Sequence, residues 1–412
     1  MLLVVSLLFY AMTSPLFLCL MVANVLSDYL LSRPIFIHGK GDRRSKTALS
    51  FAASKNILLM VAVSVGGQLN HSVITLGIMI YTFTSLGYLI DLYNGEEDPI
   101  TSIYEYMVFC CFFGKLYVGP IVSARDFCGQ LRTLRPSLTR MNDGFVWFCH
   151  GLGKKLILAN NIVLLGDRLK AIPYLEKSVA GVWLLIICYL FATYFTLSGY
   201  SDMARGIGAL FGISLPENFH YPLQSETVTD FFSNFNISAN RFVRKYVYGT
   251  LGAEDNGAVA TTINILLITM LMGLWYGISL NFLVWGTILG LFIVVETLMG
   301  DKYFLRLPTA LRKLGTLTLI VISFAVFCSG SLGQALFYLQ TMFGVGSPAL
   351  IDEQVLYLLS SNIVLLLLCV VFSTSFFSRR GRMLQHRFPH ISGIFSLCIN
   401  LSIFIISVSF LV

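Results

Sequence analysis

Long apolar runs separated by short polar segments extend along the whole chain. A helix needs about 20 apolar residues to cross the hydrocarbon core of a bilayer, and residues 1–26, 179–199 and 391–412 reach that length. Residues 260–298 are long enough for two helices. Residues 56–66 and 72–90 are expected to form two helices or one broken helix. Further helices are expected in residues 103–121, 145–166, 314–343 and 354–374. The pattern predicts an all-helical bundle of about 9–11 membrane helices, forming one integral-membrane domain over residues 1–412.

The first apolar run has no basic segment before it and contains Pro15. A cleavable signal peptide normally begins with a positively charged region. We therefore expect residues 1–26 to remain in the protein as a membrane helix.

Composition supports a membrane protein, because 56% of the residues are hydrophobic and only 12% are charged, against about 25% charged in soluble domains. The net charge of +7 comes largely from short clusters such as residues 43–46 and 379–382. Such clusters are typical of cytoplasmic loops under the positive-inside rule, and no basic amphipathic stripe indicates nucleic-acid binding. The nine cysteines lack a C-x-x-C pattern, which favours a packing role over a metal site or disulfide framework.

Two stretches combine polar, charged and aromatic residues in a way that suits neither lipid contact nor a flexible loop. In residues 195–222, Asp202 and Arg205 lie three apart and share a helix face. They form either a structural ion pair or part of a water-lined site. In residues 230–252, aromatic and basic residues alternate. That pattern is typical of an interfacial helix or of a binding surface for an acidic headgroup or cofactor phosphate. Both interpretations stay open.

Short motifs recur in a fixed order between about residues 75 and 345. They are Asp91–Gly95, Gly119–Ile121 with Asp126–Phe127, Gly151–Lys155, Leu197–Met203, Pro216–Phe219 with Tyr221–Pro222, Asp230–Phe231, Ile237–Ser238, Arg244, Tyr246–Tyr248, Gly273–Trp275 and Trp285–Gly286. Each motif alone is weak, whereas the ordered set is specific. The set resembles the membrane-bound O-acyltransferase (MBOAT) family, in the bacterial branch that includes alginate O-acetylation and teichoic-acid D-alanylation proteins.

The resemblance implies a ring of helices around a central tunnel, in a multi-pass protein of the bacterial cytoplasmic (inner) membrane. An acyl donor such as acetyl-CoA or an acyl carrier protein would enter from the cytoplasmic side, with no tightly bound cofactor and no metal. A cell-surface polysaccharide, or a secreted or membrane-attached acyl-transferring partner protein, would receive the acyl group. The residues expected to line the tunnel or bind substrate are Ser198, Tyr200, Ser201, Asp202, Arg205, Asn218, Arg244, Trp275 and Asn281.

Both histidine positions of the family pattern carry other residues here. The family motif Gly-Leu-Trp-His-Gly reads Gly273-Leu-Trp-Tyr-Gly277, so Tyr276 stands where the catalytic base is expected. The family run Trp-Arg-Arg-Trp-His before Ile-Ser reads Phe232-Ser-Asn-Phe-Asn236. Among the six histidines only His220 lies in the motif region, and nothing in its spacing places it beside Tyr276.

The substitutions change the proton chemistry expected of the site. Histidine has a pKa of about 6.5 and accepts a hydroxyl proton at neutral pH. Tyrosine titrates at about 10, so only about 0.1% is phenolate at pH 7, and an asparagine side chain does not act as a base. Loss of a general base typically slows a reaction by about 10²–10⁴-fold.

Three functions remain as hypotheses. The first is an acyltransferase that transfers an acyl, in particular acetyl, group across the membrane toward a cell-surface polysaccharide. The second is a catalytically inactive relative that acts as a binding or scaffold subunit. The third, a transporter, is disfavoured by the order of the motifs. Relatives in this branch usually carry a membrane segment before the part that matches residues 6–10, so we expect either a late start or a lost outer helix.

Overall fold

The computed structural model describes residues 1–70, 75–115, 118–134, 137–248, 257–300, 307–387 and 389–410. Within these ranges the regular structure is helical, and the one β-type pairing is the isolated bridge between Phe219 and Phe235. The predicted all-helical fold is confirmed. Two compact units divide the chain: unit 1 holds residues 1–148 and 200–217, and unit 2 holds residues 149–199 and 218–412. The prediction of one domain stays a prediction.

Unit 1 is built around long apolar helices near the N-terminus. The expected helix over residues 1–26 is instead two helices, because Ser14 adopts an extended conformation and Pro15 suits the first position of the next helix. The side chains of Ser102 and Ser123 accept hydrogen bonds from backbone amides and cap two short helices. The elements are α1 (Leu2–Thr13), α2 (Pro15–His38), α3 (Arg43–Asn70), α4 (Thr75–Asn94), α5 (Ile103–Cys111), η1 (Phe113–Lys115), α6 (Ala124–Arg132) and the first part of α7 (Leu138–Gly153).

Unit 2 carries the remaining helices. The long helix α9 (Val179–Leu210) contributes its residues up to Gly199 to this unit. The other elements are the end of α7, the π-helix η2 (Lys154–Ala159), α8 (Asn160–Ala171), η3 (Tyr174–Glu176), η4 (Pro222–Gln224), α10 (Val228–Asn234), α11 (Ile237–Val243), the π-helix η5 (Arg244–Tyr248), α12 (Gly257–Trp275), α13 (Leu280–Met299), α15 (Thr309–Phe327), α16 (Leu332–Met342), α17 (Glu353–Ser361), α18 (Ile363–Phe372), α19 (Phe376–Arg387) and α20 (Pro389–Ser409).

Six helices in the described residues are long and apolar enough to cross a membrane, namely Pro15–His38, Arg43–Val65, Val179–Leu210, Gly257–Trp275, Leu280–Met299 and Thr309–Phe327. The pair α17 and α18, bent by 60°, would add a seventh as one broken span. The protein is therefore a multi-pass membrane protein. The number is lower than the predicted 9–11 because α5 ends at Cys111, residues 145–166 divide among α7, η2 and α8, and residues 354–374 divide into α17 and α18. The predicted tunnel stays a prediction.

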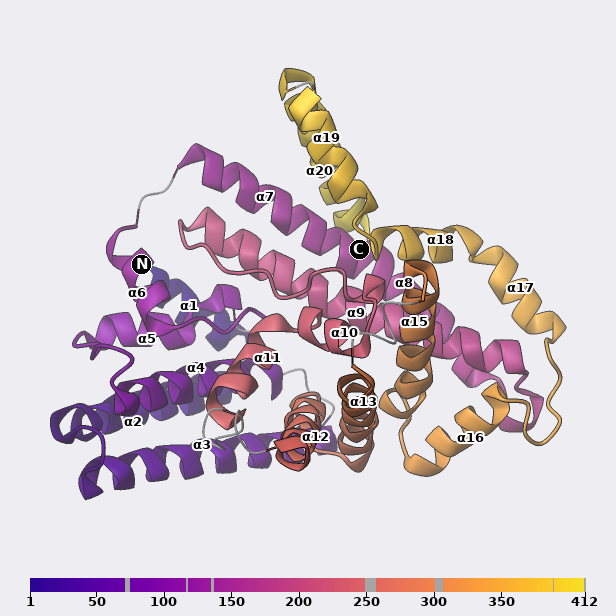
Figure 1. Cartoon of the computed structure of the whole chain (residues 1–412). Helices are drawn as coiled ribbons and strands as arrows, with labels where there is room; N and C mark the ends of the chain where they lie inside the picture. Colours follow the sequence, from indigo (N-terminus) through magenta and orange to yellow (C-terminus); the bar gives the residue numbers. More distant parts are fainter. Residues whose placement is uncertain are drawn as a thin grey trace. The chain divides into compact units, whose positions relative to one another are not determined.

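A seam of small residues holds α12 and α13 side by side (Figure 1). A Cβ atom on Gly273 would collide with the carbonyl oxygen of Phe282, and one on Gly286 with that of Thr269. One on Gly290 would collide with the Thr269 hydroxyl oxygen. Close backbone contact of this kind is how membrane helices pack without a hydrophobic driving force. The seam explains why the Gly-Leu-Trp and Trp-Gly motifs of residues 273–275 and 285–286 contain glycine.

Replacing Gly286 with alanine should destabilise the hairpin, because the new methyl group meets backbone atoms that cannot move aside. Overpacking of this kind costs about 1–3 kcal/mol. Gly315 in α15 has open space around its would-be Cβ, so Gly315→Ala is a matched control that should be neutral or stabilise by about 0.5–1 kcal/mol. Thermal unfolding in detergent measures both variants, and equal effects would show that the seam is not tight.

Candidate functional site

Tyr276 lies in the turn between the spans α12 and α13, among aromatic rings of unit 2. Its ring centroid is 6.4 Å from that of Phe235, 5.7 Å from that of Trp285 and 5.4 Å from that of Phe327. The hydroxyl oxygen is buried and lies near the Asn236 side chain, but no described residue is placed for an ideal hydrogen bond to it. Burial raises the pKa of this phenol above its ordinary value, and the nearby Asn236 side chain offsets only part of the rise. Tyr276 is therefore a protonated donor rather than a base.

Asn236 is fixed by the neighbouring segment around Asn218. The Asn218 carbonyl accepts from the Ile237 amide at 2.9 Å, its Oδ1 accepts from the Ser238 amide at 2.8 Å, and its Nδ2 donates to Asn236 Oδ1 at 3.0 Å. A backbone amide can only donate, so these bonds fix the orientation of both side-chain amides. Oδ1 of Asn236 is consequently occupied, and the group that remains is its NH₂ donor, which lies near the Tyr276 hydroxyl.

The backbone of Asn236 adopts the left-handed conformation, with φ of +57°. Asparagine and histidine are among the non-glycine residues most often found in this region. Two contacts beside it, the Phe219–Phe235 bridge and the bond from the His220 amide to the Asn234 carbonyl at 3.1 Å, hold the chain in this turn. The family histidine position thus retains a backbone that suits either residue.

The short helix α10, which leads into Asn236, is anchored at its start by two charged residues. The Glu296 carboxylate of α13 accepts from the amides of Val228 at 2.6 Å and Thr229 at 2.9 Å. Arg312 of α15 pairs with Glu226 at 2.8 Å. A carboxylate at a helix N-terminus satisfies amides that have no partner within the helix. Both anchors tie α10 to helices of the same unit.

The other predicted residues of unit 2 differ in their surroundings. Ser198 on α9 is buried, and its hydroxyl has no partner among the described residues. Trp275 is also buried. Asn281 donates to the Ser329 carbonyl at 2.6 Å and so ties the start of α13 to the end of α15. Arg244 is exposed on η5, where it donates to Asn240 at 3.3 Å.

Four predicted residues, Tyr200, Ser201, Asp202 and Arg205, belong to unit 1. Ser201 is buried, and Tyr200 and Asp202 are half-buried. The Arg205 guanidinium lies 4.2 Å from the ring centroid of Trp147, a cation–π contact. The structure therefore brings Asn236 and Tyr276 together with Asn218, while these four residues form part of a different compact unit. His220 is exposed and lies against Tyr221, at 5.5 Å between ring centroids.

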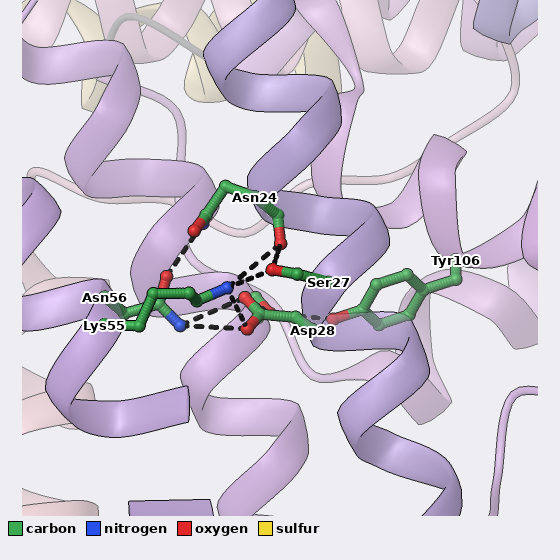
Figure 2. Close-up of polar contacts among 7 residues, drawn as sticks. Asn24, Ser27, Asp28, Lys55, Asn56 and Tyr106 are labelled. Atoms are coloured by element: carbon green, nitrogen blue, oxygen red, sulfur yellow. Dashed lines mark hydrogen bonds and ion pairs between the residues drawn. The ribbon is translucent and has the colours of Figure 1, made fainter. Parts of the chain in front are cut away.

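Unit 1 contains a buried ionic network that was not predicted from the sequence (Figure 2). Asp28 is fully buried, and its carboxylate accepts from Lys55 at 2.7 Å, from Asn56 at 3.0 Å and from Ser85 at 2.6 Å. Ser85 also bonds the Tyr106 hydroxyl at 2.7 Å. The network joins α2, α3, α4 and α5. The expected helices over residues 1–26 and 56–66 stopped short of Asp28 and Lys55, so neither charge was recognised as lying within a helix, where it would have indicated pairing.

A second buried charge in unit 1 is Lys115. It is fully buried, donates to the Phe109 carbonyl, and lies 4.6 and 4.9 Å from the ring centroids of Phe109 and Phe127. Burial lowers the pKa of this lysine to about 8, while nearby thiols raise it in part. The family motif Gly119–Ile121 follows directly, and the Gly119 amide donates to the Lys115 carbonyl at 2.8 Å.

The fold and this centre define a multi-pass, all-helical membrane protein whose polar site lies beside a glycine-packed helix hairpin. The sequence profile of MBOAT, the membrane-bound O-acyltransferase family, matches residues 96–329, more than half of the chain. The chain belongs to the membrane-bound O-acyltransferase family, which confirms the resemblance found in the sequence.

Curated relatives give the same result. The chain is 29% identical over 352 residues to a probable alginate O-acetylase AlgI of Pseudomonas fluorescens, covering 85% of this chain and 71% of the relative. It is 31% identical over 278 residues to one of Pseudomonas syringae, covering 68% and 53%. A peptidoglycan O-acetyltransferase of Helicobacter pylori is 27% identical over 314 residues, covering 68% and 59%. The chain thus spans between about half and three quarters of the length of these relatives.

Removing only the base of the Asp28 network should destabilise the protein more than removing both charges. Lys55→Met leaves a buried carboxylate without its partner, a change that typically costs about 3–5 kcal/mol. In the double variant Asp28→Asn/Lys55→Met, the neutral amide can keep bonds to Asn56 and Ser85. In detergent, the unfolding temperature of the double variant should lie between those of Lys55→Met and the wild type. If the destabilisation of the double variant equals the sum of those of Asp28→Asn and Lys55→Met, the two residues are not coupled and the pairing is contradicted.

Lys115→Met should stabilise the protein at pH 7, and the gain should shrink as the pH rises toward 10. The lowered pKa means that the unfolded chain binds a proton between about pH 8 and 10.5 that the folded chain does not. The stability of the wild type therefore rises with pH across that window, and methionine removes the cause. Unfolding temperatures of both proteins at pH 7, 8, 9 and 10 check this prediction. A difference between the two unfolding temperatures that does not change with pH would refute it.

Proposed function

We propose that this protein binds the acyl group of a thioester donor at the Tyr276–Asn236 centre and takes part in O-acylation of a cell-surface polysaccharide, without supplying the general base. One observation carries the proposal: the two family histidine positions meet in the fold, and both hold hydrogen-bond donors. Acyl transfer to a hydroxyl requires a group that removes the hydroxyl proton. Neither the buried Tyr276 phenol nor the Asn236 amide does so.

The donors retain a use in acyl binding. A phenol O–H and an amide N–H can both donate to a carbonyl oxygen, as oxyanion-stabilising groups do. The relatives are named as O-acetylases, which supports an acetyl group and a donor such as acetyl-CoA or an acetylated carrier protein on the cytoplasmic side. The base would then come from a partner protein, secreted or attached to the membrane, that accepts the acyl group or presents the polysaccharide.

A second candidate is an acyltransferase that is active by itself with altered chemistry. The names of the alginate and peptidoglycan relatives favour it, since both describe an O-acetyl transfer. In this case Tyr276 would be indispensable for turnover, whereas in the first case it serves binding only. The two candidates therefore predict different effects of Tyr276→Phe: turnover is lost if the protein is active by itself, and is unchanged if Tyr276 serves binding only.

The purified protein, supplied with radiolabelled acetyl-CoA and alginate oligomers, separates them. We expect the wild type to retain the donor on equilibrium dialysis but to acetylate the oligomers no faster than Tyr276→Phe. The variant Tyr276→His/Asn236→His should turn over at least about 10²-fold faster, because it regains bases with a pKa near neutrality.

Two outcomes would reject the proposal. Turnover by the wild type that Tyr276→Phe abolishes would establish the active enzyme. No retention of the donor by wild type or by any of the variants would show that the centre is not an acyl-donor site.

A further inference from the structure

Trp285 was not among the predicted site residues, yet its indole is buried without a hydrogen-bond partner. The residue is 3% exposed, and its Nε1 has no acceptor among the described residues. A buried tryptophan normally finds a partner for this N–H, and a buried donor left without one costs about 1–3 kcal/mol. The neighbouring Tyr276 hydroxyl is in the same condition.

Packing alone does not explain a tryptophan at this position. Its ring packs against three aromatic neighbours: Tyr276 at 5.7 Å, Phe327 at 4.8 Å and Phe324 at 6.4 Å between centroids. Phenylalanine would fill such surroundings without introducing a polar atom. The indole N–H is therefore the feature that distinguishes Trp285 from a purely apolar residue.

Three polar groups described at this centre can each donate a hydrogen bond. They are the indole N–H of Trp285, the phenol of Tyr276, and the NH₂ group of Asn236, whose oxygen is occupied by Asn218. The carboxylate of Glu296 lies three turns further along α13 and is occupied by the amides of α10. Donors in an aromatic setting select a ligand that presents acceptors.

We infer that Trp285 is a ligand-binding residue which, together with one of the two donors Tyr276 and Asn236, donates to the carbonyl oxygen of a small uncharged acyl group. The inference rests on the proposed function and names the atoms that recognise the donor. A carbonyl oxygen has two lone pairs and so accepts two such bonds. No positively charged group of the described residues acts on the Tyr276 hydroxyl, so burying a free carboxylate beside it would be costly. The ligand is therefore the acyl thioester or ester rather than the free acid.

The test compares two ligands that differ only at the carbonyl. S-acetylpantetheine carries the thioester, and S-ethylpantetheine has a CH₂ group in place of the C=O; both have the arm shared by CoA and acyl carrier proteins. Dissociation constants are measured by calorimetry with the full-length protein in detergent. We expect the wild type to prefer the acetyl compound by about tenfold, and acetate to compete with neither ligand, since one hydrogen bond to a buried group corresponds to roughly that factor.

Trp285→Phe should reduce that preference to about threefold or less, while the affinity for S-ethylpantetheine stays within about twofold. Trp183→Phe is the matched control, because Trp183 of the same unit already donates its Nε1–H to the Met342 carbonyl at 3.0 Å. This control should keep the full preference. Unfolding temperatures of both variants confirm that the comparison is made on folded protein.

The outcomes separate this inference from the proposed function. If the wild type binds both compounds equally, or if Trp285→Phe keeps the full preference, the role of Trp285 is refuted while acyl-donor binding survives. If the wild type binds neither compound, the proposed function fails and the inference fails with it.

Discussion

Close contact between α12 and α13 is the constraint on which the candidate centre depends. Because Gly273, Gly286 and Gly290 bring the two backbones together, the turn between the helices is short and its residues are held against the first turns of α13. That geometry places the Tyr276 ring against Trp285. A side chain larger than hydrogen along this seam would separate the two rings.

Asn218 provides the second fixed point of the centre. Its backbone and side chain together bind three positions of the segment 236–238, and the bridge between Phe219 and Phe235 extends the same pairing. Glu296 holds the other end of α10. The segment that carries Asn236 is thus specified at both ends by polar groups, while aromatic rings supply the packing between them.

Much of this could be predicted from the sequence. Apolar run length gave the all-helical membrane fold, and the order of the motifs gave the family and the pair of positions 236 and 276. Other features depend on tertiary contacts that no local pattern reports. A single extended residue, Ser14, divides the first apolar run, and Asp28 finds its partners on two other helices. That the indole N–H of Trp285 lacks an acceptor follows from its tertiary neighbours, which are aromatic, and not from the local sequence.

The left-handed backbone at Asn236 has an evolutionary consequence. Since histidine also tolerates this conformation, a histidine could return there without any rebuilding of the main chain. Asparagine and tyrosine codons each differ from histidine codons in the first base alone. Point substitutions at two codons separate the present centre from one with two imidazoles, so lineages of this fold can lose or regain the basic groups while the scaffold around them stays unchanged.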